Sequence, residues 1–179
     1  VIVCPPPIDE AAAASLDALG NVKHIIAPNR FHHLSVTDAA ERWPAATVHV
    51  APGLKAKRTD LAAAVDLPHR LPPHLEAFAV AGAPGLDETV LLHRPSRTLV
   101  VTDLIFNVQK LRGFWTHFFL WLAGARKRCA VDRAVKLLVK DKAAFRESLA
   151  SIVAADFDRV IMAHGDIIDA DTARAALRA

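Results

Sequence analysis

The sequence lacks long apolar runs and is poor in cysteine. A spanning helix needs about 20 consecutive apolar residues, and no run here reaches about 18, so no transmembrane helix is expected. Cys4 and Cys129 are the two cysteines, and they form no CxxC motif. We therefore expect two free thiols in a reducing cytoplasm, which excludes a disulfide-stabilised secreted domain.

The chain also has no initiator methionine and no basic leader. It opens with an apolar stretch at residues 1–3 that is typical of a strand. A signal peptide would begin with a positively charged region, so none is expected. We expect that the natural N-terminus lies upstream of Val1 and that the protein is cytoplasmic.

A length of 179 residues with 53% hydrophobic residues is enough for one domain with a substantial core, and it excludes a disordered chain. The net charge of +3 conceals an uneven distribution. Residues 108–146 hold ten Lys or Arg and two Asp, whereas the rest holds twelve Lys or Arg and seventeen Asp or Glu. This basic segment indicates either an anionic partner or a solvated helical face.

Hydrophobic periodicity and turn residues predict alternating strands and helices. The expected strands lie near residues 1–3, 23–27, 47–51, 76–81, 89–93, 98–102 and 158–163. The expected helices lie near residues 9–19, 37–43, 108–124, 131–139, 142–155 and 169–178. Asp9, Asp141 and Asp169 are suited to cap three of these helices. The order predicts an α/β fold with mixed sheets in a single domain, residues 1–179.

Potential metal ligands follow three of the predicted strands. His32 and His33 come shortly after the second strand, and Asp103 and His164 directly follow two later ones. Side chains at the carboxyl ends of strands project into the crevice where α/β sheets bind ligands. Imidazole and carboxylate groups bind Zn, Fe or Mn. Each residue alone is weak support, but their joint occurrence predicts a metal site.

Three segments carry a resemblance to a known superfamily. They are APNRFHHL at residues 27–34, RTLVVTDLIFN at 97–107 and FDRVIMAHG at 157–165. In this order they resemble the metallo-β-lactamase fold superfamily, and more closely an uncharacterised branch with an Asn-x-x-His-His motif. The resemblance covers nearly the whole chain. It implies an αββα sandwich with mixed sheets whose N-terminal hairpin is missing from this sequence.

The superfamily's motif His-x-His-x-Asp-His falls on residues 28–33. Its first two histidines coincide with Pro28 and Arg30, its aspartate with His32, and its last histidine with His33. A further histidine is usual near residues 82–87, and none is present there. One of the superfamily's two metal positions has therefore lost its histidines.

The other metal position keeps its ligands in this resemblance. The bridging aspartate coincides with Asp103 and the final histidine with His164. The resemblance thus implies at most one divalent transition metal, Zn or Fe, held by His32, His33, Asp103 and His164. A metal-free protein is the remaining alternative.

The leading hypothesis is a metal-dependent hydrolase of an unknown small-molecule substrate, with an anionic substrate as one alternative. The metal would lower the pKa of a bound water, Asp103 would act beside it, and Arg30 would steady negative charge. Asn29, Glu88 and Trp115 are weaker candidates for substrate contacts, and Asn29 also suits a hydrogen bond that orients the loop. Two alternatives stay open: a catalytically silent metal-binding or sensor domain, and a mononuclear iron redox protein.

The aromatic and basic segment at about 108–146 is expected to be helical. Its aromatic part, residues 113–124, includes Trp115 and is followed by Arg126-Lys127-Arg128. It is too short to span a bilayer. It suits core or a homodimer contact, a lid over the metal site, or, least favoured, a peripheral membrane contact. A nucleic-acid partner is not expected, because no reading motif accompanies the basic cluster.

Overall fold

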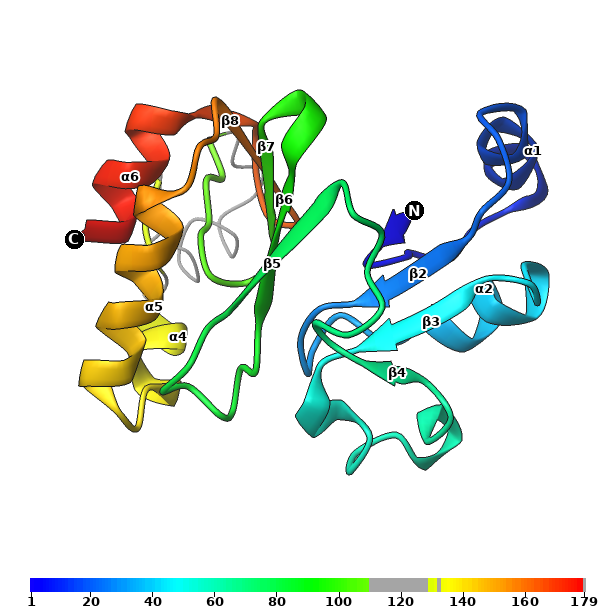
Figure 1. The fold of residues 1–179 in the computed structure, drawn as a ribbon, viewed down its shortest axis with the longest axis horizontal. Coiled ribbons are helices and arrows are strands. Elements are labelled where there is room, and N and C mark those ends of the chain that lie inside the picture. The colour runs from blue at the N-terminus through cyan, green and yellow to red at the C-terminus, as the bar shows by residue number, and fades with distance from the viewer. Residues whose placement is uncertain (110–128, 132, 179) are drawn as a thin grey trace, which may run out of the picture. The chain divides into compact units, whose positions relative to one another are not determined.

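The protein is described by a computed structural model over residues 1–109, 129–131 and 133–178. It divides into two compact units, Val1–Arg70 and Leu71–Ala179, each built on one β-sheet (Figure 1). Most of the segment expected to form an aromatic and basic helix, including Trp115, lies outside the described residues. In the described part of the chain, no helix has both the length and the apolar character needed to cross a membrane.

The first unit is a four-stranded parallel sheet. Its elements are β1 (Ile2–Val3), α1 (Glu10–Ala18), β2 (His24–Ala27), α2 (Val36–Arg42), β3 (Thr47–Val50), the 3-10 turns η1 (Pro52–Leu54) and η2 (Thr59–Leu61), and β4 (Val65–Asp66). The strands lie in the order β1-β2-β3-β4. Parallel strands need crossover connections, and α1 and α2 provide the first two.

One face of this sheet forms the core of the first unit. Side chains alternate between the two faces of a strand, so Ile25 and Ala27 of β2 share a face with Val50 of β3. All three are buried and pack with Val36 and Ala39 of α2. The strand end at Ala27, which leads into the His32-His33 loop, is therefore anchored by apolar packing.

The second unit is a five-stranded mixed sheet with helices. Its elements are β5 (Leu75–Ala79), β6 (Thr89–His93), the 3-10 turn η3 (Arg94–Ser96), β7 (Thr98–Val101), α4 (Arg133–Leu138), α5 (Lys142–Ala154), β8 (Arg159–Met162), β9 (Ile168–Asp169) and α6 (Ala170–Arg178). The strand order is β5-β6-β7-β8-β9. Strands β7 and β8 are parallel, and the other neighbours are antiparallel. The predicted α/β fold with mixed sheets is confirmed.

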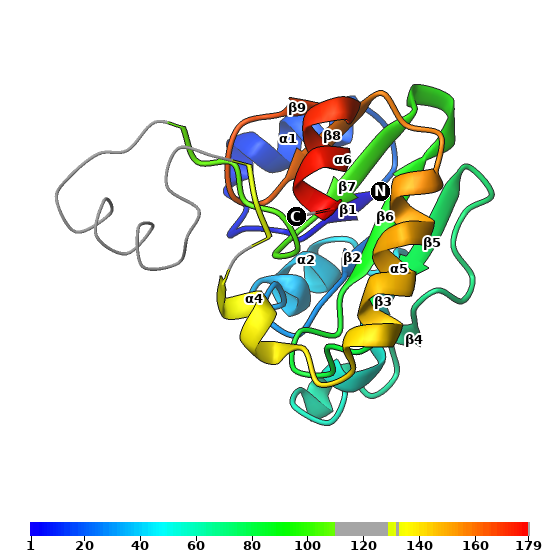
Figure 2. The same cartoon turned by 90° about the vertical axis from the view of Figure 1, so that its left-hand side faces the viewer.

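The helices of the second unit lie on one side of its sheet, as both views show (Figures 1 and 2). Phe145 and Ile152 of α5 pack with apolar side chains of the three central strands. Those strand residues are Val90, Leu92, Leu99, Val101, Val160 and Met162. Because β7 and β8 are in the middle of this core, their carboxyl ends are held firmly beside each other.

Three predicted helix starts are confirmed. Asp9, Asp141 and Asp169 stand just before α1, α5 and α6, and each carboxylate accepts a hydrogen bond from a backbone N–H of the first turn. The two-residue strands β4 and β9 were not predicted. Both are at sheet edges and are too short for a periodic pattern.

Candidate functional site

Asp103 and His164 are brought together by the register of two parallel strands. Val101 of β7 pairs with Met162 of β8, and each candidate ligand follows its strand residue by two positions. Oδ1 of Asp103 and Nε2 of His164 are 3.1 Å apart. Asp103 is buried, whereas the His164 side chain is 40% exposed, so the pair opens to solvent on the histidine side.

The loops that carry this pair are joined by backbone hydrogen bonds. The Asn107 N–H donates to the His164 carbonyl, and the Asp166 N–H donates to the Asn107 carbonyl, both at 3.0 Å. Gly165 lies between them with φ +134°, and a Cβ there would overlap the Asn107 carbonyl. The close approach of the two loops therefore requires glycine at position 165.

The His164 ring is held by an aromatic neighbour. The Phe106 ring stacks on it with centroids 4.8 Å apart and an interplanar angle of 9°. Phe106 comes from the loop after β7, which also carries Asp103. One loop thus presents the carboxylate and also sets the plane of its imidazole partner.

Glu88 supports Asp103 from behind. It precedes β6 and is fully buried, and its two carboxylate oxygens accept hydrogen bonds from the backbone N–H groups of Thr102 at 2.8 Å and Asp103 at 2.9 Å. Burial raises the pKa of Glu88, while the two N–H groups oppose that shift. The structure therefore places Glu88, a weak candidate for substrate contact, where it fixes the backbone of Asp103.

The loop after β2 belongs to the first unit and is organised by Asn29. This side chain is fully buried, and its Oδ1 accepts hydrogen bonds from the N–H groups of Phe31 at 2.9 Å and His32 at 2.8 Å. Such an Asx turn fixes the chain in place of regular structure. The predicted orienting role of Asn29 is confirmed. Arg30 lies inside this turn, and its carbonyl accepts a hydrogen bond from Lys57 Nζ at 3.1 Å.

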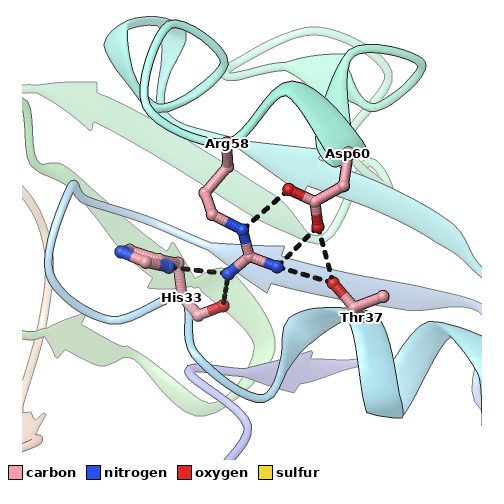
Figure 3. Close-up of polar contacts among 4 residues, drawn as sticks. All are labelled: His33, Thr37, Arg58 and Asp60. Carbon is pink, nitrogen blue, oxygen red and sulfur yellow. Dashed lines mark hydrogen bonds and ion pairs between the residues drawn. The ribbon is translucent and has the colours of Figure 1, made fainter.

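His33 is held by Arg58, as Figure 3 shows. Nη1 of Arg58 lies 2.9 Å from His33 Nδ1 and 3.0 Å from the His33 carbonyl. Asp60 binds the guanidinium with both oxygens, at 2.8 and 2.6 Å, and Thr37 Oγ1 accepts from Nη2 at 2.7 Å. Burial, together with the charges of Lys57 and Arg58, lowers the pKa of His33. The folded protein thus favours a neutral His33 imidazole.

The sequence did not reveal the roles of Arg58, Phe106 and Glu88. Arg58 lies between the strands predicted near residues 47–51 and 76–81, where no helix or strand is expected, and its bond to His33 spans 25 residues. Phe106 and Glu88 act through a ring contact and backbone groups, which leave no spacing motif in the sequence. The structure pairs Asp103 with His164 in the second unit, and it places Asn29, Arg30, His32 and His33 on one loop of the first.

Comparison with known proteins gives similarity in structure only. No protein-family model and no curated protein matches the sequence. The DIM-1 metallo-β-lactamase superposes with a TM-score of 0.59 at 11% identity, over 98% of this chain and 78% of that one. A metallo-β-lactamase from Pontibacter korlensis gives 0.58 at 12% identity, over 96% and 78%. The chemotaxis sensor ODP, described with a peroxy diiron species, gives 0.64 at 12% identity, over 98% and 78%.

Proposed function

We propose that this chain, which has the metallo-β-lactamase fold expected from its sequence, binds one divalent transition metal and is a hydrolase of a small-molecule substrate. The ligands in this proposal are Asp103 and His164, which lie together in the second unit, and His32 from the loop after β2. The observation that carries it is the pairing of Asp103 with His164 at the ends of two parallel strands.

The geometry of this pair fits a metal. Bonds of about 2.0–2.2 Å from one ion to two ligands place the ligand atoms about 3.0–3.5 Å apart in octahedral or tetrahedral geometry. The separation of 3.1 Å between Asp103 Oδ1 and His164 Nε2 lies in that range. One carboxylate and two imidazoles also form a donor set that suits Zn or Fe.

His32 is the third ligand in this proposal. Its backbone N–H is fixed by the buried Asn29, so the position of the residue on the loop is well defined. The neighbouring His33 is the less suitable donor, because its Nδ1 is already bound to Arg58.

The residues around these ligands have separate tasks. A divalent ion held there would supply a water of lowered pKa and a Lewis acid for an oxygen of the substrate. Asp103 holds its carboxylate in place because Glu88 and the core fix its backbone. Arg30 adds positive charge to the loop that carries His32, which favours an anionic substrate or developing negative charge.

A sensor is the second candidate function. Pro28 and Arg30 replace two histidines of the superfamily motif, and so part of the two-metal machinery is missing. One similar structure, ODP, is a chemotaxis sensor described with iron. The sensor ODP supports a domain that catalyses no reaction, and the two replaced histidines support one metal in place of its two irons.

Metal content and activity distinguish these proposals. Protein purified without chelators is analysed for elements, beside the variants His32→Ala, Asp103→Asn and His164→Ala. The matched control is His74→Ala, because His74 is an exposed histidine distant from these loops in the sequence. We expect one equivalent in the wild type and in the control, and little in the three variants.

An assay panel of esters, thioesters, lactams and phosphodiesters then tests catalysis. Turnover that disappears in the ligand variants supports the hydrolase. Stoichiometric metal without turnover supports the sensor, and optical and paramagnetic spectra distinguish iron from zinc. Metal far below one equivalent in the wild type overturns both proposals.

A further inference from the structure

The contact with Arg58 determines which nitrogen of the His33 ring carries the proton. A guanidinium has donors and no acceptor, so Nδ1 of His33 must be the acceptor in the 2.9 Å contact with Arg58 Nη1. A neutral imidazole with an acceptor at Nδ1 carries its proton on Nε2. A metal needs a lone pair, and in this state neither nitrogen has one to give.

Arg58 is itself held rigidly. Asp60 takes two of its N–H groups in a fork, and Thr37 on α2 accepts a third hydrogen bond and donates to Asp60 at 3.0 Å. The Arg58 Nη1 group also binds the backbone carbonyl of His33, so ring and backbone are fixed together. A fork of this kind defines direction as well as distance. The histidine therefore has one well-defined orientation (Figure 3).

The second nitrogen of His33 points away from Arg58 (Figure 3). Within the described residues, no hydrogen bond to Nε2 is formed, although the residue is only 5% exposed. Nε2 is also not one of the buried polar atoms left without a partner. Its N–H therefore has no acceptor among the described residues and is open to a ligand.

From these contacts we propose that His33 is a hydrogen-bond donor to an oxyanionic group of the substrate, a carboxylate or a phosphate, and that Arg58 is the positioning residue that keeps it so. This inference rests on the proposed metal site, because His33 directly follows the ligand His32. An oxyanion is favoured because the Arg58 guanidinium lies 2.9 Å from this ring and Lys57 binds the carbonyl of Arg30 in the same loop, so two cations lie close by while the carboxylate of Asp60 is taken up by Arg58.

The first test reads the tautomer of His33 directly. Proton–nitrogen correlation spectra of the imidazoles, assigned with a His33→Gln variant, distinguish Nε2–H from Nδ1–H rings. We expect the Nε2–H form in both the metal-free and the zinc-loaded wild type, and a mixture of tautomers in Arg58→Met. A zinc-loaded protein in which His33 Nε2 has no proton would overturn the proposal.

The second test separates donation from ligation. We expect His33→Ala and His33→Gln to keep one equivalent of zinc, unlike His32→Ala. For inorganic phosphate as the probe, we expect affinity about tenfold weaker in His33→Ala, the loss of one charge-assisted hydrogen bond. Gln retains a side-chain N–H donor, so His33→Gln should restore most of that affinity. Loss of zinc in His33→Ala, or equal phosphate affinity in all three proteins, contradicts the proposal.

Failure of the metal site gives a different result. If the wild type binds no metal, the proposed function fails, yet the tautomer of His33 and its response to phosphate are still measurable. Conversely, full metal content with a deprotonated Nε2 on His33 overturns only the donor role. Arg58→Lys checks that the guanidinium fork matters, since a lysine retains the charge without the planar geometry.

Discussion

Asp103 and His164 occupy equivalent places beyond two paired strands, and their side chains meet at 3.1 Å. Parallel neighbours end at the same edge of a sheet, so equal offsets from paired residues bring the two side chains together. The pair is then fixed by Glu88 behind the carboxylate and by Phe106 against the imidazole. Removal of either support should disturb the pair without removing a ligand.

Replacement of Glu88 by glutamine tests the first support. Glutamine has one acceptor oxygen, so one of the N–H groups of Thr102 and Asp103 would face an NH₂ group in a buried place. We expect a loss of about 1–3 kcal/mol in the free energy of unfolding, the cost of an unsatisfied buried donor. Zinc affinity should fall as well, because the backbone of Asp103 is released.

Chemical unfolding and zinc titration measure these two effects. Glu147→Gln is the control, since Glu147 is exposed on α5 and should change stability by less than about 0.5 kcal/mol. If Glu88→Gln were as stable as this control and bound zinc equally well, Glu88 would not be a support of Asp103.

Gly165→Ala tests the junction between the two loops. Gly165 and Gly20 have similar positive φ angles, +134° and +129°, but a Cβ at Gly20 meets nothing within 4 Å. We expect Gly20→Ala to cost the backbone strain alone, about 1–3 kcal/mol. Gly165→Ala adds a clash with the Asn107 carbonyl and should cost clearly more.

Thermal or urea unfolding of both glycine variants gives the comparison. The strain is nearly the same in the two variants, so the difference between them reports the clash. Equal losses would mean that the loops after β7 and β8 separate easily and that the Asp103–His164 pair is not rigid.

Much of the fold and the Asp103–His164 pair could be predicted because the patterns that determine them lie within a few residues of each position. Asp9, Asp141 and Asp169 precede apolar helical patterns, and a cap needs only the first turn that follows it. Asp103 and His164 stand directly after apolar strands, and a shared sheet edge brings such residues together. Both inferences use short windows of sequence.

The environment of His33 could not be predicted for the opposite reason. Its partner Arg58 lies 25 residues away in a stretch with scattered charges and no periodicity. Which of those charges reaches His33 depends on how η2 and α2 place Asp60 and Thr37. The sequence therefore predicted His33 as a metal ligand, whereas the choice of which ring nitrogen carries the proton depends on the tertiary structure.

The buried histidine His49 should make stability depend on pH. Burial lowers the pKa of His49, and repulsion by His24, whose Nδ1 lies 3.0 Å from its Nε2, lowers it further. At a pH below about 6.5, the ordinary pKa of histidine, the unfolded His49 binds a proton while the folded His49 stays neutral. The free energy of unfolding should therefore fall as pH is lowered through this range, and it should level off above it.

Urea unfolding between pH 8 and pH 5, with a chelator present, measures this dependence. His33 contributes in the same direction, so His49→Leu should make the slope shallower without abolishing it. His74→Leu, the same substitution at an exposed histidine, serves as the control. An unchanged slope in His49→Leu would show that its protonation does not oppose folding.

Metal binding should stabilise the fold through the same three ligands proposed for the site. A ligand that binds only the folded state adds about 2.7 kcal/mol at a concentration one hundred times its Kd. We expect this gain from zinc in the wild type and in His33→Ala, and its loss in His32→Ala and His164→Ala. His32 comes from the first unit and His164 from the second, so loss in both variants would show that one ion needs both units. A gain that persists in His32→Ala but not in His164→Ala would confine the site to the second unit, and the ligand set would have to exclude the loop after β2.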